Sequence, residues 1–419
     1  MNKPLDILVV TGAFPLASET FVREQCRSLV ELGQNVEVLA LRPGDGQWDA
    51  ADLAVDLPER TSTANIDRRL PERMLLGVPR LMKHGIGSPR LGFNLVRPAH
   101  GWRATSGQLL EIASALGGAR RFDIIHCQFG PMGRMACLLK KAGLISGEIT
   151  TTFLGYDITR EIKKHGKEVY RELFREARLL LPNSEYLKRL LLEADAPREK
   201  VVLHRLGIKV EEFPFVDRTG RTGPLKILAV GRFVEKKGFR YLLHALADVE
   251  PRVALECRII GDGPLMPELK ALAAKLELGD SVRFMGWQDV DEVAGAMVEA
   301  DLLMAPSVTA EDGDMEGMPL VIAEAMSTGL PVIGTRHSGI PEAVHDGENG
   351  VLVEERDVGG LANAIGSFSD PGRRLAAGIK SREILAAEFE AQKQAKGLLG
   401  LFRGVLGDLS TVKSDDENM

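Results

Sequence analysis

The chain has 419 residues, of which 44% are hydrophobic and 27% are charged, so it is long enough for two globular domains. Its formal net charge of -6 is not the basic balance of a nucleic-acid-binding protein, and we expect no nucleic-acid partner. No apolar run approaches the roughly 20 residues that a membrane-spanning helix needs. Widely spaced cysteines and a first apolar stretch too short for a signal peptide predict a cytoplasmic protein.

Short β-rich segments alternate with helical segments along the first half of the chain. A helix is predicted at residues 20–32, where Gly33 ends it. Strands are predicted at residues 6–10, 36–39, 123–128, 149–154, 179–182 and 201–204. This alternation indicates a parallel sheet covered by helices, and we assign it to a first domain of residues 1–206.

Residues 66–104 interrupt the alternation with a basic insert. It contains Arg68, Arg69, Arg73, Arg80, Lys83, Arg90, Arg97 and Arg103 against only Asp67 and Glu72, with apolar residues between them. A basic amphipathic segment of this kind can lie on anionic lipid headgroups. A solvated helical hairpin packed on the first domain explains the same pattern, and the sequence leaves both interpretations open.

The alternation restarts at residue 225, after a linker of residues 207–224. Strands are predicted at residues 226–230, 254–260, 282–286, 301–305, 331–334 and 350–353, within a second domain of residues 225–390. A helix over residues 391–410 is expected to pack back toward the first domain, and residues 411–419 are acidic and predicted to be disordered. The fold class is therefore α/β, with two Rossmann-like, doubly wound domains facing each other across a cleft.

Two glycine turns follow predicted strands of the second domain. The first contains Gly231, Arg232 and Lys237, where close backbone approach and two cations suit a diphosphate, although a solvated basic loop has the same composition. The second is Gly261-Asp262-Gly263, which is weak evidence by itself. It lacks the third glycine of a dinucleotide fingerprint, and the chain has no P-loop and no His-Glu-x-x-His helix.

Glu316 and Glu324 enclose an apolar run in which the second carboxylate needs a partner. Pro319 suits the first turn of a helix, so the amides of Gly317 and Met318 are expected to point outward. At about 1.5 Å per helical residue the two carboxylates lie roughly 10 Å apart, which fits a nucleotide sugar.

These motifs resemble the donor half of glycosyltransferase family 4. The resemblance rests on Gly231-Arg232 with Lys237-Gly238, Gly261-Asp262-Gly263, Glu316 with Glu324, and Gly329 with Pro331-Val332-Ile333. The first half is similar to the subgroup that assembles bacterial exopolysaccharides, in Phe14-Pro15, Ser18-Glu19-Thr20-Phe21-Val22, His126 and Asn183-Ser184-Glu185-Tyr186. The resemblance covers nearly the whole chain.

The resemblance implies a GT-B fold and a retaining transferase that needs no metal and no other cofactor. Its donor is a UDP- or GDP-linked hexose, and its acceptor is a lipid-linked or growing polysaccharide at the inner face of the membrane. Carried over to this chain, Arg232 and Lys237 bind the diphosphate, Glu316 binds the sugar hydroxyls and Glu324 binds the ribose. Trp287 is expected near the base.

The first half departs from the family pattern at one residue. Leu154 stands where the family usually has a histidine that contacts the donor sugar. Asp157 and His126 are candidates to approach the sugar or acceptor instead, although a lone histidine at a strand end is also typical of a structural role. Gly12 and Glu19 are candidates on the acceptor side; capping of the following helix is the alternative for Glu19.

Two other functions compete with sugar transfer. Leu154 motivates a catalytically weakened relative that holds a nucleotide sugar or regulates a partner transferase. A sugar-nucleotide epimerase on the same architecture would form a new nucleotide sugar without an acceptor.

Overall fold

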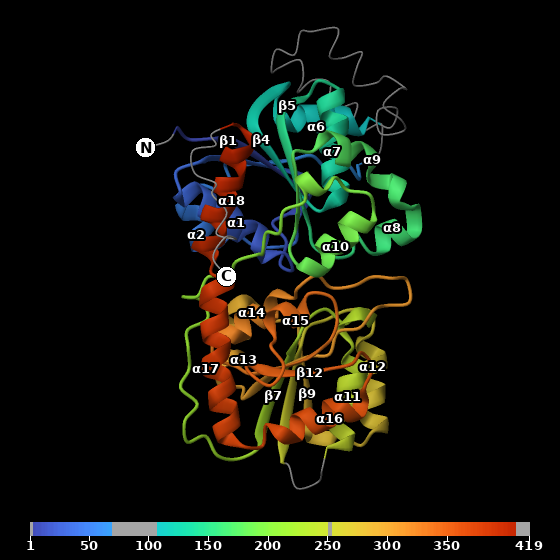
Figure 1. Cartoon of the computed structure of the whole chain (residues 1–419), viewed down its shortest axis with the longest axis vertical. Coiled ribbons are helices and arrows are strands. Elements are labelled where there is room, and N and C mark those ends of the chain that lie inside the picture. Colours follow the sequence, from blue (N-terminus) through green and yellow to red (C-terminus); the bar gives the residue numbers. More distant parts are fainter. Residues whose placement is uncertain (1–2, 69–106, 250–253, 408–419) are drawn as a thin grey trace.

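In the computed structural model, which describes residues 3–68, 107–249 and 254–407, the chain forms two six-stranded parallel sheets (Figure 1). The first sheet, in what we call the first half, has the order β3-β2-β1-β4-β5-β6. Its strands are β1 (Asp6–Phe14), β2 (Asn35–Pro43), β3 (Thr61–Thr63), β4 (Arg120–Gln128), β5 (Ile145–Phe153) and β6 (Leu179–Pro182). Its order reverses at β1 and β4, which places their carboxyl ends at a ligand-binding edge.

Helices cover both faces of the first sheet. They are α1 (Thr20–Glu31), α2 (Ala50–Ala54), α6 (Gln108–Leu116), α7 (Gly130–Lys141), α8 (Arg160–His165), α9 (Arg171–Glu176) and α10 (Glu185–Glu193). Successive residues of β1 point to opposite faces, so Leu8 and Val10 enter one apolar core while Ile7 and Val9 enter the other. A strand buried on both faces is continuously apolar, as this one is.

The second half repeats this architecture with the order β12-β11-β10-β7-β8-β9. Its strands are β7 (Leu225–Val230), β8 (Leu255–Ile260), β9 (Val282–Gly286), β10 (Leu302–Ala305), β11 (Val332–Thr335) and β12 (Gly350–Val353). Its helices are α11 (Phe239–Asp248), α12 (Met266–Lys275), α13 (Val290–Glu299), α14 (Leu320–Ser327), α15 (Ile340–Ala343), α16 (Val358–Ser367) and α17 (Pro371–Glu388). Ile227 and Leu228 again enter opposite cores, so the same alternation builds both sheets.

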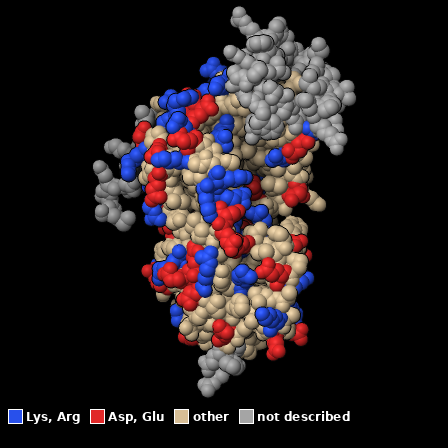
Figure 2. Space-filling view, turned by 90° about the vertical axis from the view of Figure 1, so that its right-hand side faces the viewer, with Lys and Arg blue, Asp and Glu red and all other residues tan. Residues whose placement is uncertain are grey.

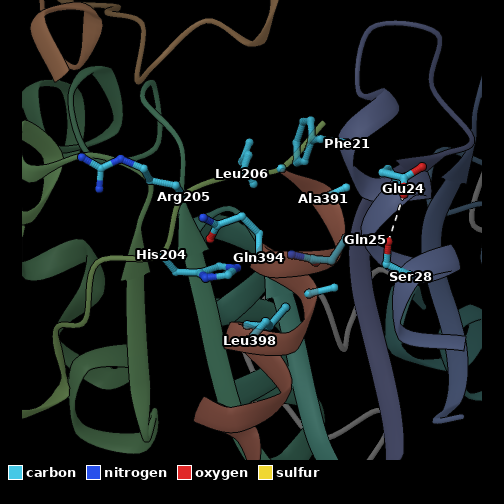
Figure 3. A pocket seen from close by; sticks show the side chains of 12 residues that line it. Phe21, Glu24, Gln25, Ser28, His204, Arg205, Leu206, Ala391, Gln394 and Leu398 are labelled. Atoms are coloured by element: carbon cyan, nitrogen blue, oxygen red, sulfur yellow. Dashed lines mark hydrogen bonds between the residues drawn. The ribbon is translucent and has the colours of Figure 1, made fainter. Parts of the chain in front are cut away.

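The last described helix, α18 (Ala391–Val405), crosses back to the first half, where it runs beside α1 (Figure 1). Leu398 and Phe402 of this helix are buried in the core that also holds Val22, Cys26 and Leu29 of α1. A cavity of about 20 Å³ remains between α1, residues 204–207 and α18 (Figure 3). That volume has room for about one water molecule, far too little for a nucleotide sugar.

The strand predicted at residues 201–204 is wrong. The amides of Val202 and His204 do donate to the carbonyls of Leu180 and Pro182, but only one isolated bridge forms, between Leu180 and Val201. Pro182 has no N–H to donate back, so the ladder cannot continue.

Residues 69–104 of the predicted basic insert and the predicted tail of residues 411–419 lie outside the described residues. Within the described ranges, none of the helices is both long enough and apolar enough to span a bilayer.

Candidate active site

A glycine turn at the end of β7 brings Lys237 against the backbone. Gly231 has φ of +153°, and a Cβ there would lie 3.0 Å from Lys237 Cε, so the lysine stem covers this peptide directly. Lys236 and Lys237 belong to a short 3₁₀ helix, Glu235–Lys237, while the side chain of Arg232 is exposed. The turn therefore presents cations at the carboxyl edge of the second sheet.

Glu316 meets these cations from a different loop. Its Oε1 lies 3.3 Å from Lys237 Nζ and 3.5 Å from Lys236 Nζ, and its side chain is only 12% exposed. Lys236 also bonds Asp314 at 3.0 Å. Burial alone would raise the pKa of Glu316, but Lys237 and Lys236 outweigh it and lower the pKa to about 2. Glu316 is therefore ionised at any physiological pH.

Glu324 lies on the second turn of α14, which begins at Leu320 and has Pro319 as its N-cap. Glu324 is a half-buried residue, and within the described part of the chain its carboxylate forms no ion pair. Burial, followed by repulsion from Glu212 of the linker, raises the pKa of Glu324 to about 7, although Lys237 lowers it. The partner that the sequence required is thus missing, as expected of a carboxylate that meets a ligand.

Gly317 and Met318 lie between Glu316 and Glu324 in the chain. Both are packed against other parts of the protein. A Cβ on Gly317 would lie 2.4 Å from the carbonyl oxygen of Leu154, so the second half here packs directly on the first half. Met318 is buried in the core of the second half. The sequence predicted that the backbone amides of these two residues point outward. Packing on one side limits the space that a ligand could use to reach them.

The second glycine turn interlocks with the first. The Phe233 amide donates to the Asp262 carbonyl at 2.8 Å, and Cβ atoms on Gly261 and Gly263 would meet the backbone of this neighbouring turn at 1.9 and 2.8 Å. Trp287 follows β9 at the same edge and is 60% exposed. The structure thus gathers Gly231, Gly261, Gly263 and Trp287 at one edge of the sheet.

Asp157 has a structural role in the first half. Its fully buried carboxylate accepts the amides of Leu154, Gly155 and Gly130 at 3.1, 2.9 and 3.0 Å. Burial raises its pKa to about 6, against the opposing effect of these amides. The side chain shapes the loop after β5 and does not reach the cleft, which corrects its assignment as a catalytic group.

His126 is also fully buried. Its ring nitrogens lie 2.9 Å from Thr150 Oγ1 and 3.3 Å from Thr152 Oγ1, and its ring packs on Phe402 at 5.2 Å between centroids. Burial lowers its pKa to about 3, so it stays neutral. A histidine enclosed by threonines and a phenylalanine has no access to a sugar, which corrects its assignment as a catalytic residue.

Gly12 in β1 and Glu19 just before α1 are the acceptor-side candidates of the first half. Glu19 precedes α1, yet its side chain makes no capping hydrogen bond, so the capping alternative is wrong. Burial raises its pKa to about 7, while the charge of Arg232 from the opposite half lowers it. A Cβ on Gly12 would meet nothing within 4 Å, so open space lies beside it. The effect of Arg232 on Glu19 indicates that these two side chains approach each other from opposite halves.

The two halves also meet through charges outside these motifs. Arg160 of α8 lies 3.4 Å from Asp312 and 3.8 Å from Asp314, and Lys163 donates to the Glu311 carbonyl at 2.6 Å. Figure 2 shows blue and red side chains adjoining where the halves meet. These contacts hold the acidic loop that leads to Glu316.

Sequence reasoning missed two residues beneath Glu316. The backbone N–H of Glu316 donates to Nε2 of the buried His337 at 3.1 Å, and His337 Nδ1 lies 2.6 Å from Glu355 Oε1. His337 and Glu355 each follow a strand, β11 and β12, at the edge that carries the glycine turns. Their positions just after two predicted strands were the sequence signal that could have identified them as residues near the site.

The sheets and the paired charges agree with two family models. "Glycosyl transferase 4-like domain" matches residues 17–207, and "Glycosyl transferases group 1" matches residues 224–370. The chain belongs to this glycosyltransferase family, and its two facing sheets form a GT-B fold.

Individual relatives cover almost the whole chain. The protein WcaL of Escherichia coli (strain K12), whose name assigns it to colanic acid biosynthesis as a glycosyltransferase, is 35% identical over 94% of this chain and 98% of its own. The amylovoran biosynthesis glycosyltransferase AmsK of Erwinia amylovora is 34% identical over 84% of this chain and 88% of its own.

Solved structures share the fold at lower identity. Anabaena Alr3699/HepE, solved in complex with UDP, has a TM-score of 0.69 at 18% identity and covers 96% of this chain and 100% of its own. The sucrose-phosphate synthase of Thermosynechococcus elongatus has a TM-score of 0.70 at 19% identity over 96% and 99% of the two chains.

Proposed function

We propose that this glycosyltransferase moves a hexose from a UDP- or GDP-sugar to a lipid-linked or growing polysaccharide, with retention of anomeric configuration and without an obligatory metal. The observation that carries the proposal is the ion pair of Glu316 with Lys237 and Lys236, formed between two loops at the carboxyl edge of the donor sheet. The names of the relatives, colanic acid and amylovoran biosynthesis, support a surface polysaccharide as the product.

The donor lies along the second half, residues 225–390. Lys237 and the exposed Arg232 bind the diphosphate, Glu316 accepts hydrogen bonds from sugar hydroxyls, and the unpaired Glu324 accepts them from the ribose. The base lies toward Trp287 and the turn of Gly261, Asp262 and Gly263. Glu316 and Lys237 hold each other before the donor arrives, so the donor meets side chains that are already placed.

During transfer, the bond from the anomeric carbon to the phosphate oxygen breaks and the acceptor oxygen bonds to that carbon. Negative charge grows on the leaving diphosphate, where Arg232 and Lys237 stabilise it without moving. This arrangement supplies the charge that a metal would otherwise provide, which supports metal independence. Retention rests on the resemblance to glycosyltransferase family 4.

The acceptor lies against residues 1–206, with its hydroxyl beside Gly12 and Glu19. The carboxylate of Glu19 takes the proton that this hydroxyl loses, because its pKa of about 7 leaves it partly ionised at neutral pH. Leu154 offers no polar side chain, so its backbone carbonyl, which faces Gly317, maintains the contact between the halves. Binding at the inner face of the membrane through residues 66–104 stays a prediction.

The test is nucleotide release by the purified full-length protein, measured with a panel of UDP- and GDP-hexoses with and without polysaccharide acceptors. We expect slow release from one donor, abolished by Glu316→Ala, and an α-linked product from an α-linked donor by proton NMR. Activity that survives chelation of divalent metals supports the metal-independent mechanism. A new nucleotide sugar formed without acceptor would show epimerase activity, and donor binding without any release would show a binding protein.

A further inference from the structure

A tight turn after β11 holds the peptide of Glu316 and Gly317 at two points. The Glu316 N–H donates to His337 Nε2 at 3.1 Å, and the Gly339 N–H donates to the Gly317 carbonyl at 2.9 Å. Between these contacts Ser338 adopts φ of +48°, a conformation that a residue with a side chain rarely takes. The backbone is thus bent where it supports the sugar-binding loop, as strained residues at functional sites often are.

The hydrogen bonds of His337 define its tautomer. Nε2 accepts the Glu316 N–H, so it carries no proton, and Nδ1 must carry the proton that it donates to Glu355 Oε1 at 2.6 Å. Glu355 is fixed in turn, because it accepts the amide of Thr309 at 2.8 Å and its hydroxyl at 3.0 Å. Arg356 pairs with Glu355 at 3.2 Å. Both ring nitrogens of His337 and both carboxylate oxygens of Glu355 therefore have defined partners.

The charges around His337 act in opposite directions. Burial and the nearby Lys236 disfavour the charged ring, while Glu355 and Glu316 favour it, and the net result is a pKa below the usual value of histidine. The ring is therefore neutral at neutral pH. Protonation would place an N–H on Nε2 against the N–H of Glu316, so the contact to the loop would be lost.

We infer that His337 and Glu355 form a positioning pair that fixes the backbone of Glu316, and through it the carboxylate that meets the donor sugar. His337 is fully buried beneath the loop, and Glu355 is held by His337, Thr309 and Arg356, so we assign neither side chain a contact with substrate. This inference rests on the proposed function, because it assigns a role to the support of the sugar-binding residue. It predicts that loss of the pair affects the sugar end of the donor more than the nucleotide end.

The first experiment compares variants at His337. His337→Phe keeps a ring but removes the acceptor nitrogen, whereas His337→Gln offers an oxygen that can accept the Glu316 N–H. We expect kcat to fall about 10- to 100-fold in His337→Phe, because small misplacement of a reacting group costs this much. Binding of the free nucleotide should stay unchanged, and His337→Gln should recover part of the rate. The control is His345→Phe, a partly exposed histidine on the same half.

Glu355→Gln gives a second route to the same pair. The amide is nearly the same size as the carboxylate but cannot accept both Thr309 donors and the His337 proton, so kcat should fall in the same direction. Thermal unfolding of each variant identifies loss of fold. If His337→Phe does not fold, Glu355→Gln and His337→Gln decide the outcome.

Two readouts separate positioning from general stability. In the wild type, activity should fall at acid pH as His337 gains a proton, and His337→Gln should lose this part of the profile. Nitrogen NMR of labelled histidine, assigned with His337→Gln, should show the proton on Nδ1 at neutral pH. A proton on Nε2, or a kcat of His337→Phe equal to the wild type, would overturn the inference.

Different results would contradict the positioning role and the proposed function. If the wild type transfers sugar and Glu316→Gln does not, while His337→Phe retains its rate, only the positioning role is wrong. If the wild type releases nucleotide from no donor, the proposed function is wrong, and the nitrogen shifts alone then decide whether the pair has the tautomer inferred for it.

Discussion

Polar residues at strand ends serve different purposes in the two halves of this molecule. In the second half, Glu316 pairs with lysines that come from another loop, and a ligand can replace such contacts. In the first half, Asp157 accepts backbone amides of its own loop and of Gly130 at the start of α7, and His126 bonds to threonines of the adjacent strand. A polar side chain is thus a better candidate for a site when its partners are charged side chains than when they are backbone amides or hydroxyl groups.

Removal of Lys237 tests the donor side of this comparison most severely. Lys237→Ala should lower kcat by about 100-fold or more, because one preorganised donor to a developing charge has about that value. Arg232→Ala should act in the same direction. The measurement is steady-state nucleotide release, with Lys270→Ala, an exposed lysine of α12, as the control. Near-normal rates of both Lys237→Ala and Arg232→Ala would contradict the assignment of the charged residues of the second half to donor binding.

Glu324→Gln should weaken donor binding more than it slows the chemical step. A hydrogen bond to a charged group contributes about 1.5 to 3 kcal/mol, which corresponds to about 10- to 100-fold in affinity. Calorimetric titration with the donor nucleotide checks this. Equal affinity of Glu324→Gln and the wild type would place the ribose elsewhere.

Glu19 links the halves, and its pH dependence tests that link. Because its folded pKa of about 7 exceeds the ordinary 4.5, its ionised form destabilises the fold as pH rises. Glu19→Gln should therefore be more stable than the wild type at pH 8, by on the order of 1 kcal/mol after solvent screening, and equal to it at pH 4. Activity should lose the limb that titrates near pH 7. Identical profiles of the two proteins would contradict a role as proton acceptor.

His126→Gln should have the smallest effect on activity. The variant loses a buried ring and its packing on Phe402, so unfolding should become easier by about 1 to 3 kcal/mol. The kcat of the folded protein should stay the same. A large fall in kcat without loss of stability would return His126 to the active site.

The alternation of strands and helices was readable because most strands carry a short apolar run, as in β1 and β7, and the helices between them follow a different spacing of apolar residues. The pattern predicted two parallel sheets, and the structure supplies the order of their strands. The strand predicted at residues 201–204 has a normal strand composition. It fails to form because Pro182 of the neighbouring strand β6 limits the pairing.

Within the site, the charged residues of the second half were predictable from local motifs. The support beneath them was not, because His337 and Glu355 reach Glu316 only after three separate strand ends meet at one edge. In the first half, no residue near His126 in the sequence predicts its contact with Phe402. That side chain belongs to α18 and packs on the His126 ring. Burial of this kind depends on contacts between distant segments and has no local signature.

The return of α18 to the first half has a consequence for how the molecule is made. A ribosome releases the first half early, yet Leu398 and Phe402 complete its apolar core only when residues 391–405 have emerged. During the intervening synthesis, at about 5 to 20 residues per second, the face of α1 stays exposed to solvent. The part of the protein that is translated first is therefore the part that is finished last, and it is the natural place for a chaperone to act on the growing chain.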